Sequence, residues 1–190
     1  GRERDPVWAG AVAELAGADI ITVHLREDRR HINDRDLRIL RQTVGTKFNL
    51  EMANSPEIVE IALTIKPDQV TLVPEKREEV TTEGGLNVRD NLVSLRESVK
   101  KFGDAGILVS FFIDPVDAQL VASRDCGAQL VELHTGSYAN ARSEPSAREE
   151  LDKLRAAALL GGEMGLRINA GHGLNYINGK PVVDLPHLQE

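Results

Sequence analysis

The chain has 190 residues, of which 41% are hydrophobic, so it is long enough to bury a sizeable core in one domain and is not expected to be disordered. Its formal net charge of −7 argues against general binding to nucleic acid or to anionic membranes. Cys126 is the only cysteine, which excludes an intrachain disulfide, and its apolar setting indicates a core residue rather than a nucleophile. With neither a long apolar span nor a signal-like N-terminus, the expected location is the cytoplasm.

Helices and strands are predicted to alternate along the chain. Helical spacing, capping residues and Pro or Gly boundaries predict helices over residues 6–15, 34–44, 55–66, 87–104, 114–126 and 146–164. Short apolar runs predict strands over residues 20–25, 47–52, 69–73, 107–113, 130–134 and 166–170. Glycine stands at four helix exits, where a left-handed backbone costs it little: Gly17, Gly106, Gly127 and Gly165. Residues 74–86 form a long polar loop after a strand, and such loops are often functional.

Repeated strand–helix units require parallel strands, so the fold class is α/β. A barrel is favoured over an open sheet, because a barrel can recruit the carboxyl ends of nearly all its strands to one site. Candidate polar residues lie at or near the ends of five strands: His24, Glu51, Asp114, Glu132, His134 and His172. A complete (β/α)8 TIM barrel usually needs about 250 residues. Residues 1–190 are therefore predicted to form a single, incomplete barrel domain that lacks the first and last strands.

Three of these residues point to proton transfer. Two imidazoles and a carboxylate, from His24, Glu51 and His172, could move protons around a carbonyl substrate if they face one pocket. Each of them alone could instead be a paired residue of the barrel core. A metal site formed by His24, Glu51, His134 and His172 is a competing interpretation, although no HxH or HExxH spacing is present.

A local anion site is a further prediction, despite the negative net charge. Arg26 shares a strand face with His24, His31 follows in the next loop, and Thr81 and the turn 171–173 (Gly-His-Gly) add a hydroxyl and close backbone approach. Other charged runs are interpreted as solvated: Arg29, Arg30, Arg35 and Arg38, and the loop segment from Glu75 to Glu79.

Five long segments resemble one family. They are TVHLREDRRHIND (22–34), NLEMA (49–53), LVPEKREEVTTEGGL (72–86), VELHTGSYA (131–139) and INAGHGLNY (168–176). In this order and spacing they resemble the pyridoxine 5'-phosphate synthases of vitamin B6 biosynthesis, and the resemblance runs through nearly the whole chain.

The resemblance implies a (β/α)8 barrel, typically a homo-octamer, that condenses 3-amino-2-oxopropyl phosphate with 1-deoxy-D-xylulose 5-phosphate. The products would be pyridoxine 5'-phosphate, phosphate and water, with no metal or organic cofactor. It implies that His24 and Glu51 are proton acceptors, that His172 is the proton donor and that Glu132 stabilises charge in the transition state. Substrate binding would fall to Arg26, His31, Thr81 and Gly173. The partners are then small phosphorylated molecules and other copies of the chain, not nucleic acid or a membrane.

The chain also departs from the family pattern. An Asn-x-Asp-His motif of the first strand and a nearby arginine are missing, as are the eighth strand and its glycine-rich phosphate loop. Two exposed sheet edges and impaired activity of this piece alone are therefore expected. We also expect residues 74–86 to close over the substrates around a Gly84-Gly85 hinge.

Two other functions remain open from the sequence. A phosphosugar lyase or isomerase, such as an aldolase, would need a metal or a Schiff-base lysine, for which only Lys47 has a suitable position. A non-catalytic fragment that retains ligand binding is the other alternative.

Overall fold

The computed structural model describes residues 5–81 and 84–190, so Thr82 and Glu83 of the predicted lid loop, and residues 1–4, lie outside it. In this part of the chain the strands are β1 (Ile20–Leu25), β2 (Lys47–Met52), β3 (Gln69–Leu72), β4 (Leu108–Ile113), β5 (Leu130–His134) and β6 (Arg167–Gly171). The α-helices are α1 (Pro6–Leu15), α2 (Asp34–Thr43), α3 (Pro56–Ile65), α4 (Leu92–Asp104), α5 (Asp117–Cys126), α6 (Gly136–Ala139), α7 (Glu144–Glu163) and α8 (Lys180–Val183). Two short 3₁₀ helices are η1 (Arg77–Glu79) and η2 (Arg89–Asn91).

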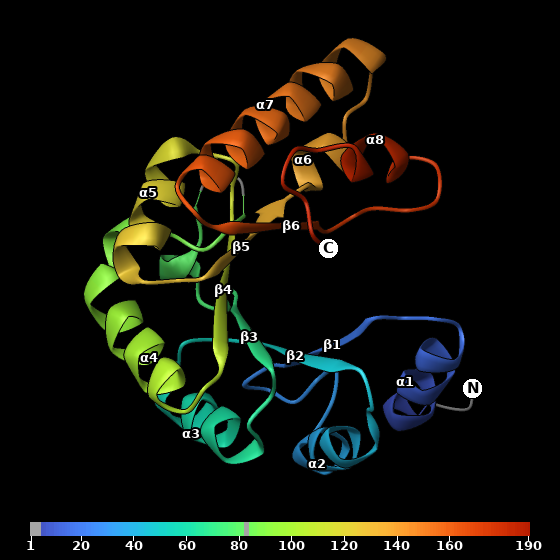
Figure 1. Cartoon of the computed structure of the whole chain (residues 1–190), viewed down its shortest axis with the longest axis vertical. Coiled ribbons are helices and arrows are strands. Elements are labelled where there is room, and N and C mark those ends of the chain that lie inside the picture. The colour runs from blue at the N-terminus through green and yellow to red at the C-terminus, as the bar shows by residue number, and fades with distance from the viewer. Residues whose placement is uncertain (1–4, 82–83) are drawn as a thin grey trace.

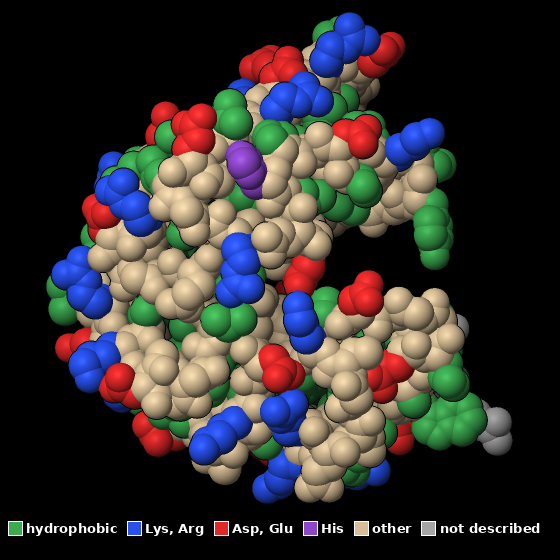
Figure 2. All heavy atoms as spheres, viewed as in Figure 1, with side chains coloured by type: hydrophobic (Ala, Val, Ile, Leu, Met, Phe, Trp, Pro, Cys, Tyr) green, Lys and Arg blue, Asp and Glu red, His purple; other side chains and the backbone are tan. Residues whose placement is uncertain are grey.

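The strands form one parallel sheet in chain order, from β1 to β6. Figure 1 shows the sheet curving as an open arc with the longer helices outside it, and with α1 and α8 on either side of the opening. The same view as spheres shows a notch at this opening, bordered by acidic side chains (Figure 2). The structure is thus an α/β half-barrel, as the alternating pattern predicted.

One predicted edge is partly covered. Leu188 forms a parallel bridge with Ile168 of β6. Gln189 N donates to Ile168 O at 2.8 Å, and Ala170 N donates to Glu190 O at 3.0 Å. The expectation of two exposed edges is therefore wrong along this part of β6, because the last residues hydrogen-bond there as a strand would.

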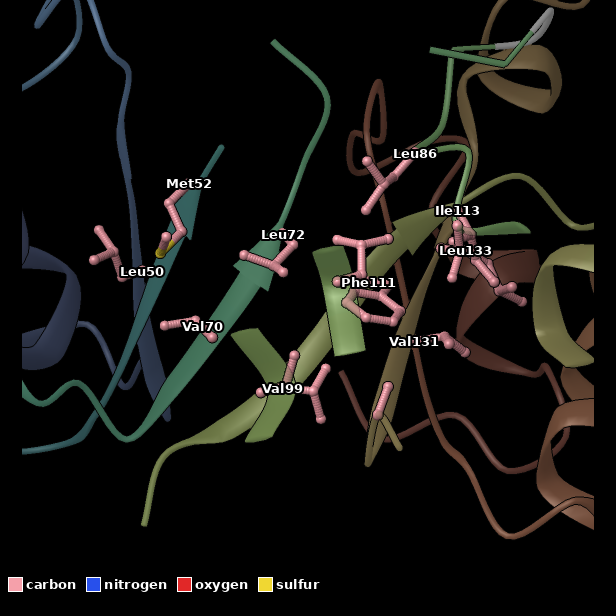
Figure 3. Packing of buried hydrophobic residues seen from close by; sticks show 14 of the residues in the cluster. Leu50, Met52, Val70, Leu72, Leu86, Val99, Phe111, Ile113, Val131 and Leu133 are labelled. Carbon is pink, nitrogen blue, oxygen red and sulfur yellow. The ribbon is translucent and has the colours of Figure 1, made fainter. Parts of the chain in front are cut away.

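The two faces of the sheet differ in polarity because side chains alternate along each strand. In β2, Phe48, Leu50 and Met52 are fully buried in the apolar core beneath the helices, whereas Asn49 and Glu51 occupy the alternate positions. Figure 3 shows the same apolar layer continuing across the neighbouring strands: Val70 and Leu72 of β3, Phe111 and Ile113 of β4, and Val131 and Leu133 of β5.

Polar side chains on the other face connect neighbouring strands. Asn49 Nδ2 donates to Thr22 Oγ1 at 3.3 Å, and Thr71 Oγ1 donates to Asn49 Oδ1 at 3.1 Å. These bonds join β1, β2 and β3 in one register. Two residues further along each strand, the same register sets His24 opposite Glu51.

Most predicted boundaries agree with the structure to within one or two residues, and the four exit glycines have φ between 77° and 97°. The start of α5 is the main correction. The predicted cap Asp114 instead accepts a hydrogen bond from Gly85 N at 3.1 Å, and the helix begins at Asp117. Similarly, α4 begins at Leu92 after η2 rather than at Asn87, whose side-chain oxygen accepts from Gln119.

Two further sequence expectations bear on location and reactivity. Among the described residues, no helix combines the length and the apolar character that a membrane crossing would require. Cys126 is 3% exposed, and burial raises the pKa of its thiol to about 11, which agrees with a core residue rather than a nucleophile.

Replacing Leu72 with alanine should lower the free energy of unfolding by about 2–5 kcal/mol, because the side chain is fully buried and its loss leaves a cavity. Chemical denaturation measures this change. Leu159→Ala is the control, since Leu159 is 47% exposed and its truncation should cost little. Equal losses in the two variants would contradict the packing of the apolar layer.

Candidate active site

A pocket of about 400 Å³ lies at the carboxyl ends of the strands. It is lined by His24, Glu51, Val73, Pro74, Gly84, Phe112, Glu132 and His172. The parallel sheet explains this set, because parallel strands all present their carboxyl ends at the same rim. Side chains from β1, β2, β4, β5 and the segment after β6 therefore meet there.

The four candidate proton-transfer and charge-stabilising residues all line this pocket. His24 Nδ1 is 3.9 Å from Glu51 Oε2 across the β1–β2 pair. Glu132 comes from β5, and His172 follows β6. The His172 ring packs against the rings of His134 and Phe112, with centroids 5.0 and 6.1 Å apart. The site therefore combines two imidazoles with two carboxyl groups in one cavity.

Glu132 is the most strongly perturbed of these groups. Burial, with the charges of Glu51 and Glu190, raises the pKa of its carboxyl to about 8. Gly171 makes room for this carboxyl, since a Cβ there would lie 2.4 Å from Glu132 Oε1. Glu132 is consequently a neutral acid near pH 7, able to donate a hydrogen bond into the pocket.

His172 is held in an unusual backbone conformation. Its φ is 90°, in the region that favours glycine, and Gly173 follows with φ of 73°. The fully buried Thr135 stabilises this turn: its hydroxyl lies 2.6 Å from the carbonyl oxygens of both Gly171 and His172, and its N–H donates to Gly171 O. The backbone turn that carries the imidazole is thus held by one buried hydroxyl, and the ring itself packs against His134 and Phe112.

The residues predicted to hold substrate lie around the pocket but are engaged elsewhere. Arg26 donates to both carboxylate oxygens of Asp28, at 3.0 and 3.1 Å, and this guanidinium lowers the pKa of Asp28 to about 2. The Thr81 hydroxyl donates to Asp114. The His31 ring meets the His24 ring edge-on, with centroids 5.4 Å apart. Neither Arg26 nor Thr81 lines the pocket in this conformation.

Asp114 and His134 form a polar pair beside the pocket. His134 Nδ1 is 3.2 Å from Asp114 Oδ1, which also accepts from Gly85 N. Burial tends to raise the pKa of Asp114, but hydrogen bonds from His134, Thr81 and Gly85 outweigh it and lower that pKa. Both residues stand at strand ends in the sequence, yet nothing in their spacing indicates that Asp114, paired with His134, holds Thr81 and Gly85 of the loop 74–86.

Glu75 corrects a sequence interpretation. It was assigned to a solvated run, but its side chain is only 5% exposed. One carboxylate oxygen lies 3.1 Å from His24 Nε2, and the other accepts from Glu27 N at 3.0 Å. Arg29 is also more enclosed than predicted, with hydrogen bonds to Glu57 and Asp34, while Arg30 and Arg35 are exposed as expected.

The alternatives left open by the sequence can also be located. In residues 5–81 and 84–190, no group of three His, Cys, Asp or Glu side chains is arranged to hold a metal ion. Lys47 begins β2 and lines a different cavity with Arg41 and Arg167, at the end of the strand opposite to Glu51. It is therefore far along β2 from the pocket that a Schiff-base mechanism would use.

A family comparison covers the whole chain: the family described as "Pyridoxal phosphate biosynthesis protein PdxJ" matches residues 1–190. Relatives described as pyridoxine 5'-phosphate synthase include that of Geotalea uraniireducens, 57% identical over 190 residues, which are 100% of this chain and 80% of the relative. That of Photobacterium profundum is 57% identical over 189 residues, 100% of this chain and 78% of the relative. That of a Synechococcus species is 57% identical over 188 residues, with coverages of 99% and 79%.

Solved structures with little sequence identity share the fold. Phosphoribosyl anthranilate isomerase from Thermus thermophilus has a TM-score of 0.61 at 17% identity, over 96% of this chain and 80% of that one. KGPDC from Streptococcus mutans has 0.65 at 15%, with coverages of 96% and 81%. The YdjI aldolase of Escherichia coli K12 has 0.66 at 12%, with coverages of 97% and 69%. At this identity the likeness bears on the fold alone, and it confirms the predicted barrel class.

Glu132→Gln should change the pH dependence of stability. The folded state binds the Glu132 proton up to about pH 8, whereas the ordinary pKa is 4.5, so ionisation destabilises the folded chain as the pH rises from 4.5 to 8. The variant should therefore unfold at higher denaturant concentration than the parent at about pH 9, and at a similar one at about pH 4. Glu163→Gln, at an exposed position, is the control. Parallel pH profiles in parent and Glu132→Gln would refute the raised pKa.

Thr135→Val should loosen the turn at His172. The valine keeps the shape of threonine but removes the buried hydroxyl that lies 2.6 Å from the carbonyl oxygens of Gly171 and His172, at a cost of about 1–3 kcal/mol. Faster amide exchange at residues 172–173 and lower stability are expected, and Thr135→Ser should retain most of both properties. Unchanged exchange in Thr135→Val would show that the hydroxyl does not hold the turn.

Proposed function

This chain belongs to the family of the pyridoxal phosphate biosynthesis protein PdxJ, and from that premise we propose how its pocket works as a pyridoxine 5'-phosphate synthase. The substrates are 3-amino-2-oxopropyl phosphate and 1-deoxy-D-xylulose 5-phosphate, and the products are pyridoxine 5'-phosphate, phosphate and water. The observation that carries the proposal is the convergence of His24, Glu51, Glu132 and His172 on one cavity.

Ring closure from two carbonyl compounds, one of which also carries the amine, needs protons moved at several atoms. Schiff-base formation, loss of phosphate, carbon–carbon closure and dehydration each remove a proton from one atom or deliver one to another. His24 and Glu51, 3.9 Å apart, accept protons from the condensing substrates. His172, which lines the same pocket, donates a proton to the departing oxygen. Acid–base catalysis by these groups requires neither a metal nor an organic cofactor.

Glu132 contributes as an uncharged acid. With a pKa of about 8, its carboxyl keeps its proton at neutral pH and donates a hydrogen bond to negative charge that develops on a substrate oxygen. The burial of Glu132 makes this interaction stronger than it would be in water. Glu132 therefore favours the transition state over the bound substrates.

Substrate binding involves Arg26, His31, Thr81 and Gly173, in the proposed assignment. When the substrates bind, Arg26 gives up its hydrogen bonds to Asp28, and Thr81 gives up its hydrogen bond to Asp114. Each then donates to a phosphate or hydroxyl oxygen of a substrate. Pro74 and Gly84, near the two ends of the loop, already line the pocket. Closure of this loop would exclude water from imine and enamine intermediates. Protection of the loop from protease by both substrates together is the expected consequence.

The assembly and location follow the family as well. We propose a homo-octamer in the cytoplasm, with small phosphorylated molecules as the other partners.

Incubation with both substrates should yield pyridoxine 5'-phosphate and an equal amount of phosphate. The fluorescence of pyridoxine 5'-phosphate measures its formation, and phosphate release is measured in parallel. Glu51→Gln should lower kcat by about 100-fold or more, with KM changed much less, because a lost proton acceptor affects the chemical steps. Glu60→Gln, an exposed change of the same type, should leave both constants intact.

The same assay should include the chain joined to the flanking segments of a relative, since the chain spans about 80% of the relatives' length. We expect the 190-residue chain alone to be the less active of the two. Absence of product from both folded proteins, or full activity of Glu51→Gln, would contradict the proposal.

A further inference from the structure

We propose that Glu75 is a positioning residue that sets the orientation and the tautomer of His24. The inference rests on the proposed role of His24 as a proton acceptor, and it gives a function to a loop residue that the sequence pattern assigns to solvent. Glu75 acts through the imidazole and contributes no group to the substrates.

His24 lies between two carboxyl groups that meet its two ring nitrogens separately. Nε2 is 3.1 Å from Glu75 Oε1, which is hydrogen-bonding distance. Nδ1 is 3.9 Å from Glu51 Oε2, which is longer than a hydrogen bond. The two contacts are therefore not equivalent: Glu75 is within hydrogen-bonding distance of Nε2, whereas Nδ1 makes no hydrogen bond with Glu51.

The Glu75 carboxylate is itself held in place. Its second oxygen accepts from Glu27 N at 3.0 Å, and its own N–H donates to Glu79 Oε2 at 3.0 Å. With 5% of the side chain exposed, water competes little for these bonds. The carboxylate consequently presents a fixed acceptor to His24 and cannot easily turn away.

This arrangement selects one form of the neutral imidazole. A carboxylate can only accept hydrogen bonds. The ring proton is therefore on Nε2, and this N–H donates a hydrogen bond to Glu75. Nδ1 then carries the free lone pair, and it is the atom that can take a proton from a substrate. Without Glu75 the ring could place its proton on either nitrogen and rotate about its side-chain bonds, which would leave fewer molecules in the reactive form.

The contact also joins distant parts of the chain. Glu75 begins the loop after β3, yet it reaches the end of β1, 51 residues earlier, across the intervening β2. Lys76 Nζ lies 3.7 Å from Glu27 Oε1 and adds a second connection between the same segments. The start of the loop 74–86 is thus attached to the residue that we assign as base.

Glu75→Gln tests the proposal with little change in shape. The amide has one oxygen, so it can accept from His24 Nε2 or from Glu27 N but not from both as two carboxylate oxygens do. We expect ¹⁵N-histidine NMR to show His24 protonated at Nε2 in the parent, and a mixture of tautomers in the variant. We expect kcat to fall by about 10–100-fold, with KM within about threefold. Glu78→Gln, an exposed change in the same loop, should alter neither.

A second variant distinguishes positioning from a structural role. If Glu75 acts through the imidazole, Glu75→Gln introduced into His24→Asn should lower kcat by less than about twofold more. An equal loss with and without His24 would show that Glu75 only anchors the loop, and would overturn the proposal.

The NMR measurement on the parent stands apart from activity. Protonation of His24 at Nδ1 in the folded parent would overturn the inference, even if Glu75→Gln failed to fold. A parent that forms no product would instead contradict the proposed function, while the tautomer of His24 would still decide the role of Glu75.

Discussion

The structure depends on the register of a parallel sheet whose two faces have opposite polarity. Each strand contributes alternate residues to the apolar layer under the helices and to the polar inner face, so a slip of one residue would exchange the two. In β2 such a slip would bring Glu51 into the layer that now holds Leu50 and Met52. The hydrogen bonds of Asn49 with Thr22 and Thr71 help to hold β1, β2 and β3 in this register. The rim that carries the candidate site residues is therefore a consequence of the same alternation that builds the core.

Carboxyl groups in and beside the pocket differ in pKa because their surroundings differ. Glu132 has lost water without gaining a cation, so burial raises its pKa to about 8 and it remains neutral. Asp114 is also buried, but hydrogen bonds from His134, Thr81 and Gly85 favour its charged form. A proton-bearing acid in the pocket and a charged carboxylate beside it can therefore coexist at the same pH.

The loop 74–86 is connected to histidines at both of its ends. Glu75 bonds His24 near the start, and Asp114 bonds His134 while also accepting from Gly85 and Thr81 near the end. A change in the position of this loop would alter the hydrogen bond to His24 directly, and the bonds of Thr81 and Gly85 to Asp114, which in turn contacts His134.

The sequence by itself determined the order of the elements, the parallel class of the sheet and the rim at which the candidate residues meet. These features depend on local information: apolar alternation, capping residues, and glycines at positions of positive φ such as Gly106 and Gly127. The long segments shared with the PdxJ family added the candidate residues, and spacing alone would not have separated His24 or Glu132 from paired core residues.

Only the tertiary structure decided which polar groups meet. Glu75 stands in a run of charged loop residues, and only the pairing of β1 with β2 and of β2 with β3 brings it to His24. Asp114 precedes a proline, as a helix-capping residue often does. Its side chain instead hydrogen-bonds Gly85 of the loop and His134 of β5, and α5 begins only at Asp117. The raised pKa of Glu132 likewise requires burial together with Glu51 and Glu190. Such contacts join residues far apart in the chain, and a local pattern contains no information about them.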